Sequence, residues 1–348
     1  MLRAARHAGL ETAMLNLLWA RIALRVLPLL LLLPALASAA DLSPIPEALK
    51  TELSKVQHDP PPKELAANAH FVISDERAHN LYRESVQGLG GVLVGVGTDP
   101  NYLFAGWMKA ELVLLVDFDQ VVTDLHGVYG VDLKNSASAD EFVGFWSPKQ
   151  QAASLGLLEK EAPDAATKKR WVAAYKLGRS QIYDKWLGVK KKYKTEKVPS
   201  LLSDADQYAH VRKLAQTGRI WAWRGDLTAQ NTMSGLANVL KAQNLEVTVF
   251  YITNAEAYFN YTPQARKNLH DLPYAAKSVL LRTQGRPEKA DEIADGHYTY
   301  YVQSGKDFVA WLERRGVTSA KPICWVRKAM GPQGLFSLAG PPQPKAKK

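Results

Sequence analysis

The sequence is poor in cysteine. Cys324 is the one cysteine among 348 residues, so no disulfide can form within the chain. A chain of this length buries enough apolar surface to fold without one. Cys324 lies in the apolar run 322–326, which is typical of a buried strand, and no histidine is close to it in sequence. We therefore interpret it as a small buried side chain. The alternative is a thiol nucleophile.

Short catalytic motifs are also missing. The sequence has no His-Glu-x-x-His, no Gly-x-Ser-x-Gly and no Gly-x-x-x-x-Gly-Lys-Ser/Thr. These absences argue against a zinc peptidase of that kind, a serine hydrolase of the common α/β type and a P-loop nucleotide hydrolase. The eight histidines show no tight metal-ligand spacing, so we expect no metal site.

Acidic residues are fewer than basic ones, 34 against 44, which gives a formal net charge of +10. The densest basic run, residues 190–197, contains Tyr193 as its one aromatic residue. This pattern favours the solvated end of a helix, and we expect no nucleic-acid binding. The alternative is a patch for nucleic acid, anionic lipid or an envelope polymer.

The N-terminus lacks an apolar run long enough to span a bilayer, which takes ~20 residues. A region with four arginines and one glutamate precedes a short apolar run at 26–36, which ends in Ala37-Ser-Ala-Ala40. This order is typical of a secretory signal peptide. We expect residues 1–40 to be removed and the protein to be exported to the periplasm or the extracellular space, without a transmembrane span. An uncleaved anchor or a buried helix is the alternative, and Met14 is a second plausible start.

The rest of the chain predicts one α/β domain at residues 70–330. We expect a Pro-rich extension at 41–69, which acts as a tether with at most one helix, near Pro46 to Val56, and a disordered basic tail at 331–348. Within the domain we predict strands and helices in alternation. The strands are expected at 92–96, 112–117, 219–223, 247–252, 278–282, 298–302 and 322–327. The helices are expected at 75–87, 99–108, 120–133, 228–242, 262–272 and 306–315, with a helical insertion at 136–217.

This alternation favours a doubly wound, mostly parallel sheet of the Rossmann-like kind. Ligands of such sheets bind beyond the carboxyl ends of the strands. The first strand ends in Gly95-x-Gly97, and glycines there allow a tight turn and close approach of a ligand. Asp99 follows, either beside the ligand or as the cap of the next helix. The alternative for the whole loop is a simple strand-to-helix turn.

Acidic and amide side chains follow the next strands. Asp117, at the end of the second strand, is placed to accept hydrogen bonds from the hydroxyls of a ribose, and Asp119 to cap the following helix. Asp226 follows the third strand, either as a ligand contact or as a cap, which we favour. Asn254 and Glu256 follow the fourth strand and are candidate catalytic residues that orient a polar substrate or accept a proton. The alternative for these two is a polar turn.

Gly95-x-Gly97, Asp117, Gly225-Asp226 and Asn254 resemble class I S-adenosylmethionine-dependent methyltransferases in order and spacing. The segments around them are more closely similar to a family of uncharacterised bacterial proteins with that core, over roughly residues 70–285. The resemblance implies a methyltransferase-like fold and S-adenosylmethionine as the cofactor. Two positions differ from the methyltransferase motif. Leu93 stands where an acidic residue is usual, and Asp99 replaces the third glycine, where it would repel the methionine carboxylate unless neutralised.

Two hypotheses for the function follow. The first is an exported protein with a methyltransferase-like fold that binds a small molecule or acts as a scaffold without catalysis. The alternative is an S-adenosylmethionine-dependent methyltransferase that acts on a small molecule or a protein. Export favours the first, because S-adenosylmethionine is made and kept in the cytosol.

Overall fold

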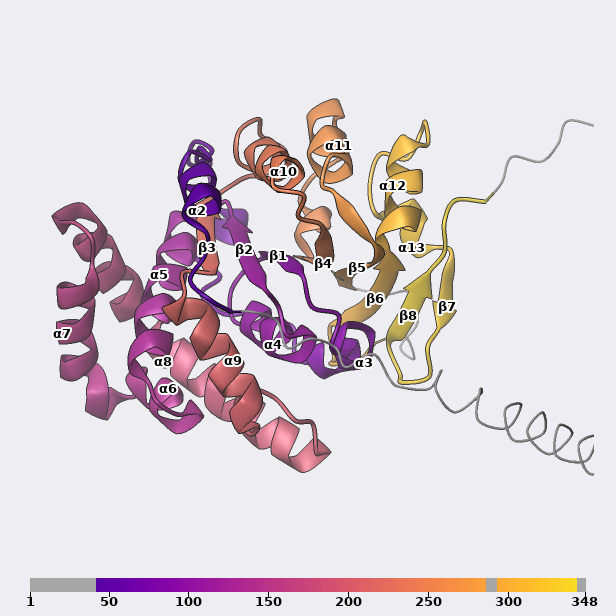
Figure 1. Ribbon diagram of the computed structural model, residues 1–348. Coiled ribbons are helices and arrows are strands. Elements are labelled where there is room, and N and C mark those ends of the chain that lie inside the picture. The colour runs from indigo at the N-terminus through magenta and orange to yellow at the C-terminus, as the bar shows by residue number, and fades with distance from the viewer. Residues whose placement is uncertain (1–41, 286–292, 343–348) are drawn as a thin grey trace, which may run out of the picture. The chain divides into compact units, whose positions relative to one another are not determined.

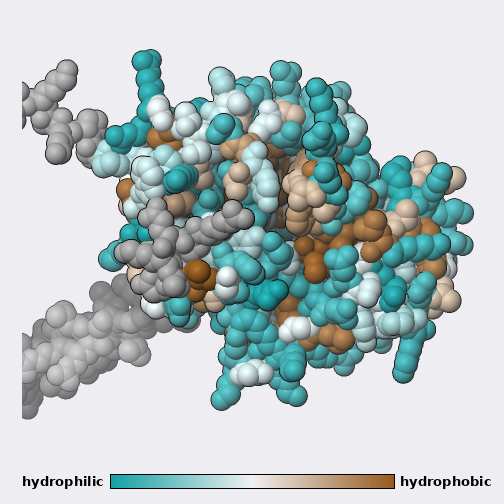
Figure 2. Space-filling view, turned by 180° about the vertical axis from the view of Figure 1, so that it is seen from behind, coloured by the Kyte–Doolittle hydropathy of each residue, from teal (hydrophilic) through white to brown (hydrophobic). Residues whose placement is uncertain are grey.

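The computed structural model describes residues 42–285 and 293–342. The expected signal peptide at 1–40 lies outside these ranges. In the described part of the chain, no helix is long and apolar enough to cross a bilayer. The face seen in Figure 2 is mainly hydrophilic, with hydrophobic residues gathered around a hollow near its middle.

Eight strands form one mixed sheet (Figure 1), in the order β3-β2-β1-β4-β5-β6-β8-β7. The five strands from β3 to β5 are parallel, β6 is antiparallel to β5, β8 is parallel to β6, and β7 is antiparallel to β8. The strands are β1 (Val92–Val96), β2 (Leu112–Asp117), β3 (Ile220–Arg224), β4 (Val247–Thr253), β5 (Tyr274–Gly285), β6 (Tyr298–Ser304), β7 (Arg327–Ala329) and β8 (Leu335–Leu338).

Helices cover both faces of the sheet, and each face has its own hydrophobic core. This is why the strands β1 and β2 are nearly continuous runs of Val and Leu. One face carries α3 (Arg83–Val86), α4 (Pro100–Met108), α5 (Gln120–Asn135), α6 (Ala139–Phe145), α8 (Ala165–Glu196) and α9 (Ala205–Gln216). The other face carries α2 (Glu47–Ser54), α10 (Thr232–Ala242), α11 (Pro263–His270), α12 (Gly305–Glu313) and α13 (Lys321–Cys324).

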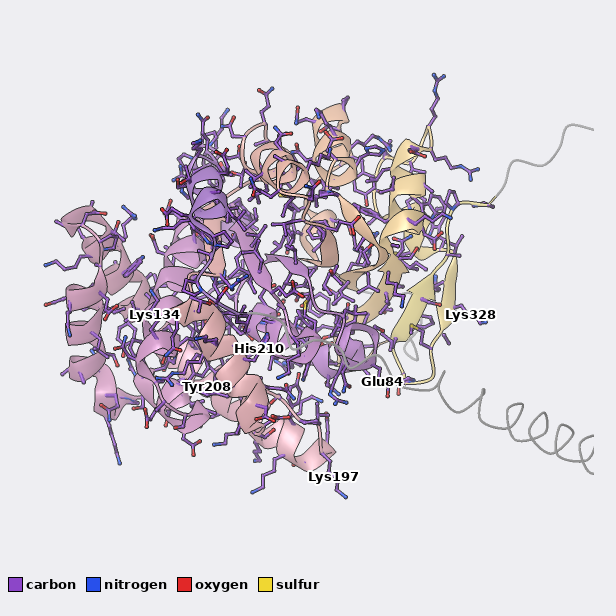
Figure 3. The ribbon with its side chains drawn as sticks, in the orientation of Figure 1. Glu84, Lys134, Lys197, Tyr208, His210 and Lys328 are labelled. Carbon is purple, nitrogen blue, oxygen red and sulfur yellow. The ribbon has the colours of Figure 1, made fainter. Side chains whose placement is uncertain are left out.

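The chain between β2 and β3 is helical throughout, and α7 (Gln151–Glu161) completes the set. Its longest member, α8, begins where the Asp164 side chain accepts a hydrogen bond from the Thr167 amide (2.8 Å). It ends at Lys197, which adopts a left-handed conformation. Figure 3 shows Tyr208 and His210 on α9. Tyr208 donates to the Ser136 carbonyl (2.9 Å) and so joins α9 to the end of α5.

Two predictions for the ends of the domain are wrong. Residues 42–69 contain an α-helix at the expected place, α2, but they are not a tether, because Leu49 and Leu53 of α2 are buried in the core that α10 also covers. The tail at 331–348 is not disordered from its start, because β8 pairs with β6 and buries Leu335 and Leu338. A four-residue strand gives little sequence signal, and β8 is stable here because it pairs with β6 on one side and β7 on the other.

Two elements differ in type or length from the prediction. The strand expected at 322–327 is instead α13 followed by β7, since Pro322 fits the first turn of a helix and lacks the N–H that a ladder needs. Cys324 is buried there, as expected. The helix expected at 75–87 is reduced to a 3₁₀ turn at His79–Tyr82 and the short α3.

Candidate functional site

The order of the strands leaves a crevice between β1 and β4. After their carboxyl ends, β1 leads into α4 on one face of the sheet and β4 leads to α11 on the other, so the two connections diverge at this edge. A pocket of about 480 Å³ lies at this place. We call it the strand-end pocket. Its walls are the segments that follow β1, β2, β3 and β4, together with residues 62–76.

The loop after β1 owes its shape to two glycines. Gly97 lines the pocket and has φ of 79°, a left-handed conformation that a side chain would strain. Gly95 serves a different purpose, because a Cβ there would lie 1.8 Å from Asn101 Oδ1. Asn101 Nδ2 donates to the carbonyls of Val96, Gly97 and Thr98 (3.1, 3.3 and 3.1 Å) and so fixes the loop. Gly95 therefore makes room for Asn101 and does not itself line the pocket.

Asp99 points away from the pocket and is fully buried. Its carboxylate accepts hydrogen bonds from the Ser74 amide (2.7 Å) and the Thr98 hydroxyl (3.1 Å). Lys185 of α8 lies 3.7 Å from the other oxygen. The side chain makes no capping bond to α4. Because Lys185 opposes the charge, Asp99 does not add an uncompensated negative charge next to the loop.

Three of the predicted aspartates stand at the pocket. Asp117 ends β2 and accepts a hydrogen bond from the Asp119 amide (2.9 Å), and burial raises the pKa of Asp117 to about 7. Asp119 caps α5 through the Val121 amide (2.9 Å) and lies 2.7 Å from His70 Nδ1. Asp226 lines the pocket and accepts bonds from the amide and hydroxyl of Thr228, so it stabilises a turn ahead of α10.

The two candidate catalytic residues are separated by the structure. Asn254 lines the pocket, and its Nδ2 donates to the Tyr298 hydroxyl (3.1 Å). Glu256 is buried beside the core that α10 and α11 cover. There Tyr261 donates a hydrogen bond to its carboxylate, and Arg282 lies 3.3 Å away. Because Glu256 is absent from the pocket lining and pairs with a fully buried arginine, its placement is that of a structural ion pair.

The sequence reasoning missed Asp75, Glu76 and Tyr251. Glu76 lies at the pocket floor and is almost fully buried. Tyr251 and Thr283 donate hydrogen bonds to its carboxylate, and His79 Nε2 lies 2.9 Å from it. The bond to His79, with the other two, holds the pKa of Glu76 below its ordinary value although burial acts in the opposite direction. The sequence feature that could have pointed to this wall of the pocket is the acidic pair Asp75-Glu76, just inside the predicted start of the domain at residue 70.

The pocket has a strongly one-sided charge. Among its described lining residues none is Lys, Arg or His. Its carboxylates are Glu64, Asp75, Glu76, Asp117, Asp119 and Asp226. Its aromatic side chains are Phe71, Phe118, Tyr251, Tyr258 and Phe259. Negative charge beside aromatic faces is an environment that stabilises a cation and disfavours a phosphate group. In the ranges that the structure describes, no group of three metal-ligand side chains is present.

The chain is a mixed α/β protein with a pocket at the carboxyl edge of its sheet. A family model described as "Domain of unknown function (DUF7790)" matches residues 71–337, and the chain belongs to this family. The fold is similar to the rRNA methyltransferase aviRa from Streptomyces viridochromogenes, at 11% sequence identity and a TM-score of 0.28, over 72% of this chain and 90% of that one. No curated protein matches the sequence.

Proposed function

We propose that the protein is an exported binding protein whose strand-end pocket takes a small organic cation. The observation that carries this proposal is the set of six carboxylates, without any Lys, Arg or His among the described lining residues, around about 480 Å³. A volume of this size suits a small molecule. The aromatic side chains provide faces on which a cation or a planar ring packs.

The charge of the pocket narrows the class of ligand. A pyrophosphate, as in a dinucleotide, would be repelled by carboxylates on several sides of the pocket. The described lining offers no cationic side chain to compensate for that repulsion. An ammonium, sulfonium or guanidinium group would instead be stabilised by Glu76, which is held anionic, and by Asp117 once it loses its proton.

S-adenosylmethionine-dependent methyl transfer is the second candidate function. It is favoured by Asp117, which stands at the end of β2 and lines the pocket, where an acidic residue accepts hydrogen bonds from ribose hydroxyls. S-adenosylmethionine carries a sulfonium and an ammonium and would supply a methyl group. Its carboxylate would rely on backbone N–H groups after β1, since the described lining offers no cation.

The location of the protein separates the two candidates. The signal-peptide pattern of residues 1–40 supports a role in the cell envelope, where S-adenosylmethionine is not made. Export therefore favours the binding role. N-terminal sequencing of protein recovered from the envelope should give a start at Ala40 or Asp41. Full-length protein in the cytosolic fraction would contradict export and favour methyl transfer.

Calorimetric titration of the mature protein tests the pocket. We expect at least one of the two cationic probes, S-adenosylmethionine and spermidine, to bind more tightly than two reference compounds. The references are S-adenosylhomocysteine, which lacks the sulfonium charge, and NAD, which carries phosphates. Asp117→Asn should weaken binding of the cation about tenfold. The matched control Glu159→Gln removes a carboxylate from the exposed surface of α7 and should change nothing. Equal affinity for cationic and phosphorylated probes would contradict the proposal.

A methyl-transfer assay decides the second candidate. The protein is incubated with S-adenosylmethionine labelled in its methyl group and with envelope or cytosolic extract. Label transferred by the wild type and not by Asp117→Asn would establish the enzyme. Tight binding of S-adenosylmethionine without transfer would leave the binding role.

A further inference from the structure

Lys185 lies in the middle of α8, outside the lining of the strand-end pocket, and contacts two of its walls. Its Nζ donates to the carbonyl oxygens of Ser74 (2.7 Å) and Glu76 (2.9 Å) and lies 3.7 Å from Asp99 Oδ2. The Lys185 side chain is 11% exposed. One ammonium therefore joins the 74–76 segment to the loop after β1.

The rest of α8 follows the same segment. A Cβ on Gly178 would lie 3.4 Å from Val72, and Asn80 donates to Glu196 (3.1 Å) at the far end. From Gly178 to Glu196 the helix rises about 27 Å at 1.5 Å per residue. The backbone from Val72 to Asn80 spans at most about 29 Å when extended. The helix is therefore long enough to contact residues 72–80 at three places, near Val72, at Ser74 and Glu76 through Lys185, and at Asn80.

The carbonyls of Ser74 and Glu76 both face Lys185, whereas the side chains of Asp75 and Glu76 line the pocket. The Ser74 amide donates to the Asp99 carboxylate, so Ser74 and Lys185 both contact Asp99. Without the ammonium, the fully buried Asp99 would lose its cation and two carbonyls would lose their donor. An unpaired charge at a buried site is strongly unfavourable, so the segment would move toward water.

We propose that Lys185 is a positioning residue through which the helical insertion shapes the strand-end pocket. Lys185 holds the 74–76 wall against the loop after β1 and thereby presents Asp75 and Glu76 to the ligand. The part of this proposal that concerns affinity rests on the proposed function. The part that concerns the wall does not, and it is tested without a ligand.

Hydrogen exchange of the mature protein tests the wall. In Lys185→Met we expect the amides of Ser74, Arg77 and Ala78 to exchange at least tenfold faster than in the wild type, while the amides of β1 and β4 keep their rates. These three amides donate to Asp99, Asp295 and Tyr300. The control Lys191→Met removes an exposed lysine from the same helix and should leave all rates unchanged. Unchanged exchange in Lys185→Met would overturn the proposal.

Two further variants separate positioning from general stability. Lys185→Arg keeps a donor with positive charge and should restore most of the protection. Lys185→Met combined with Asp99→Asn removes the unpaired buried charge, so the Tm should recover while exchange at residues 74–78 stays fast. If exchange recovers together with the Tm, Lys185 acts on stability alone and the proposal is wrong.

Titration with S-adenosylmethionine and with spermidine tests the link to affinity. For the probe that the wild type binds, Lys185→Met should bind about tenfold more weakly and Lys191→Met equally well. Equal affinity in Lys185→Met would overturn the link. If the wild type binds neither probe, the proposed function fails, and the exchange rates alone decide the role of Lys185.

Discussion

Two pockets of similar size lie on either side of α5, and they differ in how their charges are balanced. The strand-end pocket, about 480 Å³, has six lining carboxylates and no described lining cation. The second, about 520 Å³, lies between α5, the start of α8 and β3, and we call it the α5–β3 pocket. Its charged lining side chains, histidines apart, are Asp124, Lys134, Glu161, Arg170 and Arg224.

The α5–β3 pocket contains charges of both signs, and both of its arginines are hydrogen-bonded. Arg170 Nε donates to Asp124 (3.2 Å), and Arg224 donates to the Asp59 carbonyl and to Gln120 (both 2.8 Å). In the strand-end pocket Asp119 and Glu76 lie 2.7 and 2.9 Å from ring nitrogens of His70 and His79, and none of the six carboxylates forms an ion pair with Lys or Arg within the described ranges. The two volumes are similar, so volume does not distinguish the pockets. They differ in that the strand-end pocket leaves its carboxylates unbalanced by any lining lysine or arginine.

The largest expected effect comes from removing that unbalanced charge. Asp75→Asn combined with Asp117→Asn should weaken binding of an organic cation about 100-fold. We expect each carboxylate in contact with the cation to contribute roughly 1.4 kcal/mol to the binding free energy, which is a factor of about ten in affinity. Asp124→Asn combined with Glu161→Gln, in the α5–β3 pocket, should leave affinity unchanged. Calorimetric titration measures both. Equal losses in the two double variants would remove the distinction between the pockets.

One glycine in each pocket tests the backbone. Gly97→Ala should lower the free energy of unfolding by about 1–2 kcal/mol, because its φ of 79° disfavours a side chain. Gly130→Ala lies in α5, where a Cβ would meet nothing within 4 Å, and should raise it by about 0.5–1 kcal/mol. Denaturant unfolding measures both changes. A loss of stability in Gly130→Ala would contradict the open space beside α5.

The pH dependence of binding should come from Asp117, whose pKa is raised to about 7. Because a cation prefers the ionised form, affinity should fall about fivefold from pH 8 to pH 6. Stability should change in the opposite direction. The raised pKa favours the folded state at low pH, and this contribution is lost as pH rises through about 7. Titration and thermal unfolding at each pH check both signs. Asp117→Asn should abolish the change of affinity with pH. If this variant keeps the pH dependence of the wild type, another group is responsible for it.

The smallest expected effect concerns the exposed aromatics. Tyr258 lines the strand-end pocket and is 63% exposed, and Trp325 is equally exposed outside both pockets. Tyr258→Ala should weaken cation binding about threefold through loss of a cation–π contact, and Trp325→Ala should not. Titration of both variants measures the difference. Equal affinity in the wild type and Tyr258→Ala would restrict recognition to the carboxylates.

Much of the central sheet could be predicted because its signals are local. Residues 92–96 and 112–116 are unbroken apolar runs, and the structure has strands there. Gly97, Asp117, Asp226 and Asn254 lie at the carboxyl ends of β1, β2, β3 and β4, as predicted, and they line one pocket. Asp99 and Glu256 follow the same strands, but their side chains turn into the protein, and sequence position does not report that direction.

The sequence by itself determined the strands β1 to β6, the place where the parallel ones end, and the polar residues that follow them, because hydrophobic period and turn chemistry act over a few residues. Tertiary structure alone decided the pocket's far wall and its balance of charge. Residues 62–76 became a wall by packing across strands distant in sequence, Lys185 reached Asp99 from a helix 86 positions along the chain, and β8 formed where two strands could pair with it. Such contacts depend on which surfaces meet, and no local pattern records that.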